Sequence, residues 1–569
     1  MNNDAIAQAY LYFQHGKLEA AHAILQPLTL GAADFNLLHL SGAVAAGLGL
    51  HEQAIDWYVR ALALKPGDLA VSYKLGRVFY DAGRRTEALS LYLQLIASGV
   101  QHADIYVAAA LLLQDAQRND EALQTLEHAL RLAPQDVEIW YRHAVALGRL
   151  QRHADALHSI QQAISLAPDN LQYRLDLALT LYRLHRNEDA LLCIDQLLSA
   201  APNAADAWAC RAAVLSRLCR YEESIACSEK ALALQPGDAD SNVNLALTSL
   251  TLGRLDSAWP LYESRWQGEL ADPARHQDIP RWNGSQEVEG KTILLWAEQG
   301  LGDTIHFCRY AQQVVELGAL VVLEAPATLT ALMETLASSG RIQVITIGDA
   351  VPRVDLQLPL MSLPGVFGTT LETIPSRSSY LQADTSKQAQ WQVSLTPKKR
   401  LHVMRIGIVC SGNAGNHNDR RRSIPLDAFA PLLAVSDDIE FILLQPEIRQ
   451  SDEAFLQANP TILWPAPQLR AFDDTAALIA NLDFVIGVDT AAIHLAGALG
   501  VPVWVLLSKA ADWRWFLERD DSPWYPSARL FRQANADDWG EVINRVCQAL
   551  TTASAAEKII SPGGPGKTD

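Results

Sequence analysis

A glycine-rich segment that carries one carboxylate has the composition of a catalytic loop. Residues 298–304 read EQGLGDT, between an apolar run of strand length and a helical pattern. Gly300 and Gly302 let the backbone approach a ligand closely, and the start of the helix offers free N–H groups. Asp303 has the chemistry to take a proton from an acceptor hydroxyl as a general base. It is equally suited to capping the helix, so the residues alone leave both roles open.

Two other segments carry groups suited to a phosphate or diphosphate. Residues 411–413 (SGN) end a second apolar run, and residues 420–422 (RRR) follow soon after. Small residues at a strand end beside arginines suit a phosphate, although a solvated charge run has the same composition. Residues 487–497 (GVDTAAIHLAG) place Thr490 at the expected start of a helix, where its hydroxyl and nearby N–H groups can hold a diphosphate. His494, one turn later, either faces that ligand or packs against the sheet.

An aromatic segment near the C-terminus is a further candidate. Residues 512–515 (DWRW) place an arginine between two indole rings. Such a segment can stack on a base or a sugar, or it can be a packed loop, and the sequence leaves this choice open.

The segments described above lie between predicted strands and predicted helices. Apolar runs of strand length alternate with helical stretches from about residue 290 to residue 550. The expected strands are 292–297, 321–324, 342–347 and 354–358 in a first set, and 405–410, 440–445, 484–488 and 503–507 in a second. This alternation predicts two domains with parallel sheets and helices on both faces. Ligands of such open sheets bind at the carboxyl ends of the strands, so we expect a cleft there between the two domains.

The N-terminal half repeats with a period of 34 residues. Small residues recur at Gly42, Gly76, Ala110, Ala144, Ala178, Ala212 and Ala246, and again at Ala20, Ala54, Ala88, Ala122, Ala156, Ala190, Ser224 and Ala258. Prolines at Pro66, Pro134, Pro168, Pro202 and Pro236 share the period and close the second helix of a unit. The pattern resembles the tetratricopeptide repeat (TPR), with about eight units. Such arrays form a superhelix whose concave surface usually binds peptides or proteins.

Composition excludes several classes of protein. The chain has 46 basic and 64 acidic residues and a formal charge of −18, so we expect no nucleic acid as a partner. No apolar run is long enough to span a membrane, and the first residues lack the pattern of a secretory signal. The seven cysteines form no C-x-x-C pair, which fits a reducing compartment. We therefore expect a cytoplasmic protein.

The third motif, DTAAIHLAGALGVPV at residues 489–503, resembles the donor-binding signature of the heptosyltransferase-like glycosyltransferases. The LGD segment at residues 301–303 is similar to their N-terminal motif, whose aspartate is the proposed catalytic base. Arg422 resembles their basic donor-phosphate residue, which is usually a lysine. The layout of the whole chain is similar to bacterial TPR glycosyltransferases, to O-GlcNAc transferases and to the TPR proteins that glycosylate flagellin.

The resemblance implies an α + α/β multidomain chain, in which an α-solenoid (TPR superhelix) precedes a GT-B fold of two Rossmann-like α/β domains. The expected domains are the TPR array at 1–270, a Trp/Pro-rich cap and linker at 271–290, an acceptor-side half at 291–383, an interdomain linker at 384–404, a nucleotide-sugar half at 405–550 and a disordered tail at 551–569. It also implies Asp303 as the catalytic residue and no metal ion. The expected donor-binding residues are Gly302, Ser411, Asn413, Arg420, Arg422, Gln445, Asp489, Thr490, Ala491 and His494.

The function implied is transfer of a sugar from a nucleotide-activated donor to a protein hydroxyl. The donor is a substrate, and no cofactor is expected. The concave face of the repeats would recruit the acceptor protein, for which flagellin is one candidate. Two alternatives stay open. The enzyme could act on a glycan or lipid, with the repeats serving assembly only, or the chain could be a non-catalytic scaffold with a degenerate GT-B domain.

Overall fold

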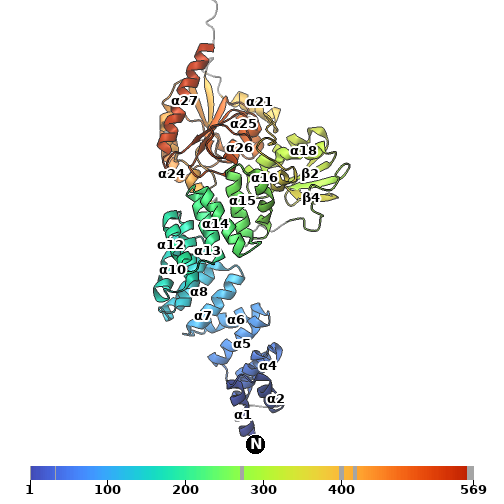
Figure 1. The fold of residues 1–569 in the computed structure, drawn as a ribbon, viewed down its shortest axis with the longest axis vertical. Helices are drawn as coiled ribbons and strands as arrows, with labels where there is room; N and C mark the ends of the chain where they lie inside the picture. Colours follow the sequence, from blue (N-terminus) through green and yellow to red (C-terminus); the bar gives the residue numbers. More distant parts are fainter. Residues whose placement is uncertain are drawn as a thin grey trace, which may run out of the picture. The chain divides into compact units, whose positions relative to one another are not determined.

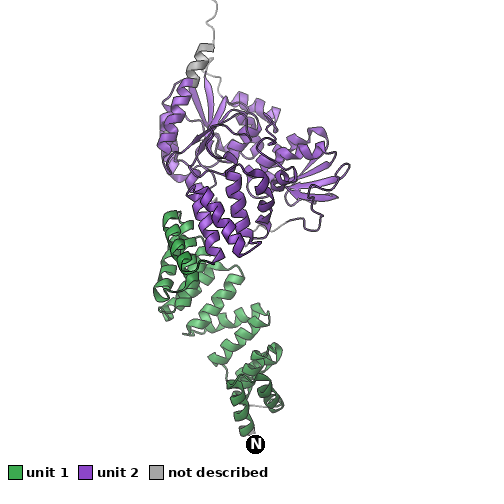
Figure 2. Cartoon of the chain, viewed as in Figure 1, with its two compact units in different colours: residues 1–202 green, residues 203–569 purple. Residues whose placement is uncertain are grey.

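The computed structural model describes residues 2–31, 34–268, 275–395, 403–413, 415 and 419–560. The chain divides into two compact units, residues 1–202 and residues 203–569 (Figure 2). The boundary between the units therefore lies well before residue 270, where the 34-residue pattern ends.

Unit 1 consists of antiparallel helix pairs that follow the 34-residue period (Figure 1). The helices are α1 (Asn2–Gln14), α2 (Leu18–Leu28), α3 (Phe35–Gly47), α4 (His51–Leu64), α5 (Leu69–Asp81), α6 (Arg85–Ala97), α7 (Ala103–Asp115), α8 (Asn119–Leu132), α9 (Val137–Arg149), α10 (His153–Leu166), α11 (Leu171–Arg183) and α12 (Asn187–Ala200). The prediction of a TPR solenoid is confirmed.

The small residue on the first helix of a pair matches the size of the side chain that it meets. In the second and third units this residue is a glycine, and a Cβ on Gly76 would lie 2.4 Å from the ring of Tyr92, just as one on Gly42 would lie 2.5 Å from Tyr58. In the next unit the equivalent residue is Ala110, which shares a core with Leu126 in place of a tyrosine. The two helices of each pair therefore stay close together, because a smaller residue on the first helix faces a larger side chain on the second.

This exchange predicts the outcome of a substitution at Gly76. Gly76→Ala forces the methyl group against the Tyr92 ring, so we expect the free energy of unfolding of unit 1 to fall by about 1–3 kcal/mol. The double variant Gly76→Ala/Tyr92→Leu recreates the Ala–Leu pairing of the following unit and should regain most of that loss. Urea unfolding followed by circular dichroism measures both. A double variant that is no more stable than Gly76→Ala would show that the contact with Tyr92 is not the cause.

Unit 2 begins with the last two helix pairs of the array. These are α13 (Ala205–Arg217), α14 (Tyr221–Leu234), α15 (Ala239–Thr251) and α16 (Leu255–Tyr262), followed by the short helix η1 (Glu263–Trp266). Leu250, Trp259 and Tyr262 are buried in the same hydrophobic core as the first sheet. The Trp259 indole also donates a hydrogen bond to the carbonyl of Thr369 (2.8 Å). The terminal repeats are therefore part of the α/β region, and Trp259 serves packing there.

Two parallel sheets follow, and each expected strand is found within one or two residues of its predicted bounds. The first sheet has the order β3-β2-β1-β4 and the second the order β6-β5-β7-β8-β9. Their strands are β1 (Thr292–Trp296), β2 (Leu320–Ala325), β3 (Ile342–Thr346), β4 (Leu356–Pro359), β5 (Met404–Val409), β6 (Ile439–Leu443), β7 (Phe484–Val488), β8 (Val503–Leu507) and β9 (Ala528–Arg532). Strand β9 is an addition that the apolar pattern did not reveal.

Helices connect and cover these strands. They are α17 (Leu301–Phe307), η2 (Cys308–Tyr310), α18 (Ala311–Glu316), α19 (Ala327–Met333), η3 (Glu334–Ser339), η4 (Leu360–Ser362), α20 (Leu363–Val366), α21 (Thr385–Ser394), α22 (Asp419–Arg422), η5 (Leu426–Phe429), α23 (Ala430–Leu433), α24 (Gln450–Ala458), η6 (Ala466–Gln468), α25 (Phe472–Ile479), α26 (Ala491–Ala498), η7 (Trp513–Trp515) and α27 (Trp539–Ile560).

Two expectations for irregular segments are corrected here. The linker expected at 384–404 contains α21, whose Lys387 forms ion pairs with Asp473 and Asp474 at the start of α25. The expected disordered tail begins inside α27, which continues to Ile560, while residues 561–569 lie outside the described residues. In both places a polar composition masked a helix.

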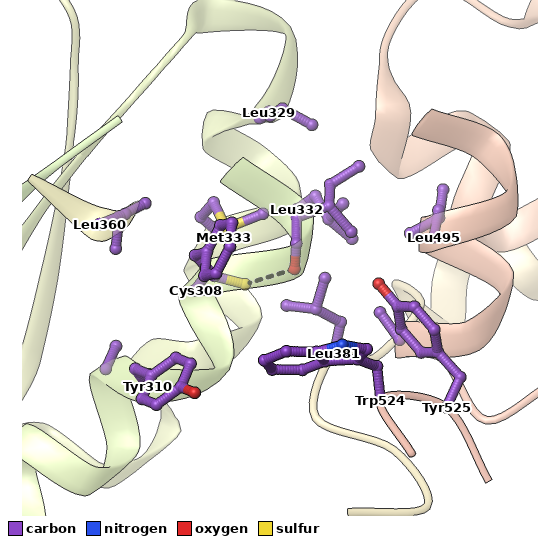
Figure 3. Close-up of a cluster of buried hydrophobic side chains, with 14 of the residues drawn as sticks. Cys308, Tyr310, Leu329, Leu332, Met333, Leu360, Leu381, Leu495, Trp524 and Tyr525 are labelled. Atoms are coloured by element: carbon purple, nitrogen blue, oxygen red, sulfur yellow. Dashed lines mark hydrogen bonds between the residues drawn. The ribbon is translucent and has the colours of Figure 1, made fainter. Parts of the chain in front are cut away.

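The two α/β halves share one buried core. Residues from η2 and α19 pack with Leu495 of α26 and with Trp524 and Tyr525, as Figure 3 shows. Backbone N–H groups of Tyr380 and Leu381 both donate to the carbonyl of Ala498 at the end of α26 (2.9 and 3.1 Å). The halves are therefore in direct contact beside the predicted cleft.

Candidate functional site

Asp303 lies in the first turn of α17, directly after the loop that connects β1 to this helix. Asp303 caps this helix from its third position, because its Oδ2 accepts a hydrogen bond from the N–H of Gly300 (2.9 Å). Its Oδ1 accepts from Nη2 of Arg514 (2.5 Å), and its side chain keeps 21% of its surface exposed. The capping role is therefore present. The exposed fraction leaves the carboxylate reachable by an acceptor, so its role as a base stays a prediction.

Arg514 comes from the aromatic segment and holds two carboxylates at once. Its Nη1 donates to Asp512 (2.8 Å), while Nη2 reaches Asp303. Burial lowers the pKa of this guanidinium, but Asp512 and Asp303 more than offset that effect and the pKa is raised. The guanidinium lies over the rings of Trp513 and Phe307. The structure therefore identifies the DWRW segment as a packed loop that orients Asp303.

The residues predicted to bind phosphate lie close together at the carboxyl ends of β5 and β7. Nη1 of Arg422 donates to the carbonyl of Asp489 (2.8 Å), which directly precedes Thr490. A Cβ on Gly412 would lie 2.7 Å from Nη2 of Arg422, so the 411–412 turn lies against this arginine. Within the described part of the chain, the buried Oγ1 of Thr490 and Nε of Arg422 have no hydrogen-bond partner. Nε of Arg422 also lies 3.7 Å from Oδ1 of Asp419, so Oγ1 of Thr490 is the group at this edge that lacks a polar partner among the described residues.

The two motifs meet at the first turns of α17 and α26. A Cβ on Gly302 would lie 3.1 Å from Cδ2 of His494 and 3.6 Å from Cα of Ala491. Because glycine has no side chain, the two turns touch, which places Asp303 and Thr490 on adjoining turns. The structure thus brings together seven of the predicted residues: Gly302, Asp303, Arg422, Asp489, Thr490, Ala491 and His494.

His494 is held on both sides of its ring. Nδ1 lies 2.9 Å from the hydroxyl of Tyr525, and Nε2 lies 3.4 Å from Oδ1 of Asp489. Its ring stacks on Trp515 with the centroids 5.4 Å apart. Burial opposes the charge of Asp489, but His494 and Arg422 hold the pKa of Asp489 below its ordinary value. The sequence left two roles open for His494, facing a ligand or packing. The contacts of its ring support packing, and they also orient Asp489.

A second histidine, His306, completes this network. Its Nδ1 also lies 2.9 Å from the Tyr525 hydroxyl, while its Nε2 is buried with no partner among the described residues. A hydroxyl has one proton, so Tyr525 donates to one histidine and accepts from the other. Burial, together with the charges of Arg309 and Arg514, lowers the pKa of His306 well below 6.5 and keeps the ring neutral.

Four other residues were predicted to bind the sugar donor, and they do not share the contacts of this group. Gln445 is a structural residue: its Oε1 accepts from the N–H of Cys410 (2.8 Å), and its Nε2 donates to Oγ of Ser411 (2.7 Å). The buried Ser411 therefore contributes backbone beside Arg422, and Gln445 fixes the turn. Asn413 is exposed and accepts from the N–H of Gly415 (2.9 Å), and Arg420 is exposed. The side chains of these four residues are of types that bind phosphates and sugars. Only the contacts in the folded chain show which of them bind the protein backbone instead.

Sequence reasoning missed the Tyr525 hydroxyl and His306 as parts of the site. Both residues stand in motifs that the sequence makes visible, the SPWYP segment at residues 522–526 and the turn after Asp303. Their pairing joins positions 219 residues apart, so no local pattern could have found it.

The lowered pKa of His306 predicts a pH-dependent stability. The unfolded chain takes up this proton near pH 6.5, whereas the folded chain takes it up only at lower pH, so stability present above pH 6.5 is lost as the pH falls below it. His306→Gln should reduce the loss of unfolding free energy between pH 7 and pH 5 by about 2 kcal/mol. Urea unfolding followed by tryptophan fluorescence at both pH values measures this. His102→Gln, at an exposed position, serves as the control, and equal pH dependence in both variants would contradict the assignment.

Comparison with known protein families agrees with this geometry. Residues 447–536 match glycosyltransferase family 9 (heptosyltransferase), a range that includes Asp489, Thr490 and His494. Overlapping matches to the tetratricopeptide repeat cover residues 73–226. The chain therefore joins TPR repeats to a glycosyltransferase family 9 domain.

Among characterised proteins, the chain is homologous to protein FlbA of Caulobacter vibrioides, with 31% identity over 329 residues. The match covers 54% of this chain and 54% of FlbA, so the chain spans about half the length of this relative. Solved structures that the chain matches include the TPR protein YrrB (19% identity, TM-score 0.30, 32% of this chain and 95% of that chain). A TPR protein from Parabacteroides merdae matches with 18% identity and a TM-score of 0.34, over 43% of this chain and 98% of that chain.

Two features are absent from the residues that the structure describes. No helix there is long and apolar enough to cross a membrane. Over the same residues, no three histidine, cysteine, aspartate or glutamate side chains are grouped so that they could hold a metal ion.

Proposed function

We propose that this chain transfers a sugar from a nucleotide-activated donor to a hydroxyl group of a protein, and that the TPR array recruits that protein. The two α/β halves act as a GT-B enzyme without a metal ion. Flagellin is a candidate acceptor. The observation that carries the proposal is the contact of Gly302 with Ala491 and His494, because it puts a carboxylate beside a phosphate-binding helix start.

The donor side supplies positive charge for the leaving diphosphate. The helix α26 begins after Thr490, so its first N–H groups and positive dipole end point at the same edge as Arg422. The unpartnered Oγ1 of Thr490 adds a hydroxyl there. These groups neutralise charge that develops as the sugar–phosphate bond breaks. Asp489, fixed by His494 and Arg422, orients the turn that presents them.

The acceptor side supplies the base. Gly300 and Arg514 hold both oxygens of Asp303, which fixes the direction of the carboxylate while part of its surface stays open. In the proposed reaction, Asp303 takes the proton of the acceptor hydroxyl as its oxygen attacks the anomeric carbon, and the nucleoside diphosphate leaves toward Arg422. An acceptor bound along the repeats would present its hydroxyl at an increased effective concentration.

Two isosteric substitutions separate the proposed base from the proposed donor site. Asp303→Asn keeps an oxygen for the N–H of Gly300, so it retains the helix cap while it removes both the base and the ion pair with Arg514. We expect turnover to fall by about 100- to 10,000-fold with nucleotide binding nearly intact. Thr490→Val should instead weaken binding of the nucleotide by about tenfold. Turnover with a panel of UDP-, ADP-, GDP- and CMP-linked sugars, together with calorimetric titration of the free nucleotides, measures both effects.

A matched control for Thr490→Val is available in α25. Thr475 is buried and its hydroxyl donates within its own helix, so Thr475→Val removes an equivalent group away from the site. It should change neither binding nor turnover. Unchanged turnover in Asp303→Asn would return Asp303 to the role of a helix cap.

The boundary between the units defines a test of the acceptor. A cut near residue 272, where the repeat pattern suggests separation, would remove Leu250, Trp259 and Tyr262 from the core of the α/β region. The fragment 203–569 retains them. It should still release nucleotide from the sugar donor slowly, but it should lose most glycosylation of protein targets in a cell lysate, because the acceptor is no longer held.

Mass spectrometry of glycopeptides from the same lysate compares this fragment with the full chain, and nucleotide release serves as the control for folding. Equal protein glycosylation by both would show that unit 1 does not select the acceptor. That result, or glycosylation found only on a glycan or lipid, would favour the assembly role. Absence of donor turnover in the full chain would favour a scaffold.

A further inference from the structure

The loop that presents Asp303 has few local sources of rigidity. Gln299 adopts a left-handed backbone conformation with φ of 58°, which is strained for a residue with a side chain. The next residue, Gly300, is the N-cap of α17 and has no side chain to contribute. Helix α17 itself has only seven residues. Besides the contact with Arg514, the direction of Asp303 therefore depends on what anchors residues 298 and 299 from outside the loop.

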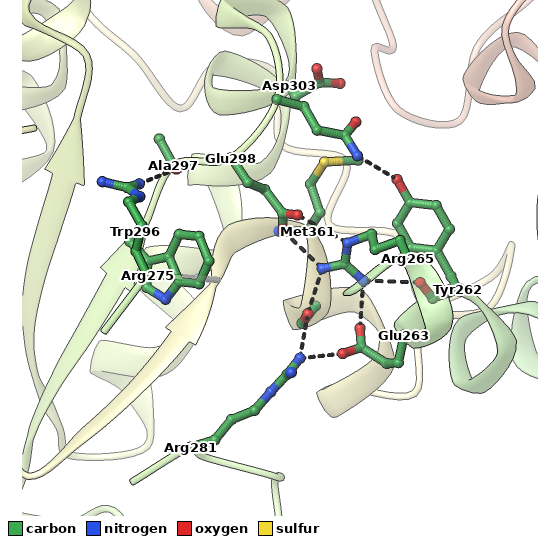
Figure 4. Close-up of polar contacts among 12 residues, drawn as sticks. Tyr262, Glu263, Arg265, Arg275, Arg281, Trp296, Ala297, Glu298, Asp303 and Met361 are labelled. Carbon is green, nitrogen blue, oxygen red and sulfur yellow. Dashed lines mark hydrogen bonds and ion pairs between the residues drawn. The ribbon is translucent and has the colours of Figure 1, made fainter. Parts of the chain in front are cut away.

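The anchor of Glu298 is Arg265 of η1, at the end of the last repeat. Nε and Nη2 of Arg265 donate to the two carboxylate oxygens of Glu298, each at 2.9 Å (Figure 4). The remaining N–H groups of Arg265 reach the carbonyl of Tyr262 (3.2 Å), Oε1 of Glu263 (2.9 Å) and Oγ of Ser362 (2.7 Å). Only 7% of the Arg265 side chain and 3% of the Glu298 side chain are exposed. The pair is thus a buried ion pair with two parallel hydrogen bonds.

The same terminal repeat contacts the loop at two further points. The hydroxyl of Tyr262 accepts a hydrogen bond from Nε2 of Gln299 (3.3 Å), the residue with the strained backbone. Trp259 of α16 packs edge-on against Trp513, on which the guanidinium of Arg514 lies. Arg514 in turn holds Asp303. Helix α16 and η1 therefore contact the groups on both sides of the carboxylate.

We propose that Arg265 is a positioning residue for the transfer reaction: through its paired hydrogen bonds to Glu298, the terminal repeat sets the direction of the Asp303 carboxylate. This inference rests on the proposed function for the role of Asp303. A buried carboxylate that loses its partner must move toward water or another donor, and residue 298 lies only five positions before Asp303. A displacement of about 1 Å at a reacting group can cost about 100-fold in rate.

The test uses the full chain with Glu298→Gln and, as a second variant that retains the positive charge, Arg265→Lys. Each removes the paired geometry without emptying the site. Hydrogen–deuterium exchange of the peptide that covers residues 299–305 should become about tenfold faster or more. With the UDP-, ADP-, GDP- and CMP-linked sugars, kcat should fall about 100-fold, while the Kd of the matching free nucleotide changes less than about twofold.

Because both residues act through one pair, the double variant Arg265→Lys/Glu298→Gln should lose little more activity than either single variant. Arg281→Gln is the matched control. Arg281 binds Glu263 and Ser362 in the same network but does not contact Glu298 or the loop, so exchange at residues 299–305 and kcat should stay as in the parent chain.

Unchanged exchange at residues 299–305 in the folded Glu298→Gln and Arg265→Lys variants would overturn the proposal, as would equal losses of kcat in Arg281→Gln. A parent chain that turns over none of the sugars would contradict the proposed function, and the exchange experiment would still decide whether Arg265 positions the loop.

Discussion

The contact between the first turns of α17 and α26 is the constraint on which the candidate site depends. It exists because Gly302 has no side chain where His494 and Ala491 approach. A larger residue would press its Cβ against the edge of the His494 ring, so one of the two turns would have to shift. The buried core around Trp524 and Tyr525 holds the two halves together at this point. A contact of this kind holds the Asp303 carboxylate beside the start of α26 without the help of a ligand.

Polar groups inside this contact select one arrangement of the halves. Apolar contacts alone tolerate small shifts of one half against the other. Hydrogen bonds do not, because each joins a particular donor to a particular acceptor. The hydroxyl of Tyr525 serves two histidines from different halves, and Arg309 donates to the carbonyl of Trp524 (2.7 Å) and to the hydroxyl of Tyr380 (3.0 Å). Leaving such buried groups unpaired is costly, so a displaced arrangement is disfavoured. The neutral state of His306 is one consequence of this dense packing.

The terminal repeats belong to the catalytic region as well as to the solenoid. In most repeat arrays each unit contacts only its neighbours, but Trp259, Tyr262 and Arg265 contact the loop or the residues that support it. This gives the last helix pair two roles that the 34-residue period does not distinguish. It closes the array, and it supports the strand end from which Asp303 is presented.

Local sequence patterns determined the elements of this protein, and long-range contacts determined its site. The spacing of Gly42, Gly76 and Ala110 predicted the helix pairs, and alternating apolar runs predicted eight of the nine strands among the described residues, because both patterns reflect burial within one element. The motifs around Asp303 and Thr490 were visible for the same reason, since a strand end and a helix start are adjacent in sequence.

The tertiary structure alone decided which polar residues bind other groups of the chain. Gln445 and Asn413 had suitable chemistry, but their hydrogen bonds serve the backbone of a turn. Arg514 was considered for stacking on a base or sugar, and it orients Asp303 from 211 residues away. The end of the repeat period similarly did not mark the boundary between the compact units. Composition and spacing report what a residue can do, whereas its partners depend on the packing of segments distant in sequence, which no local pattern contains.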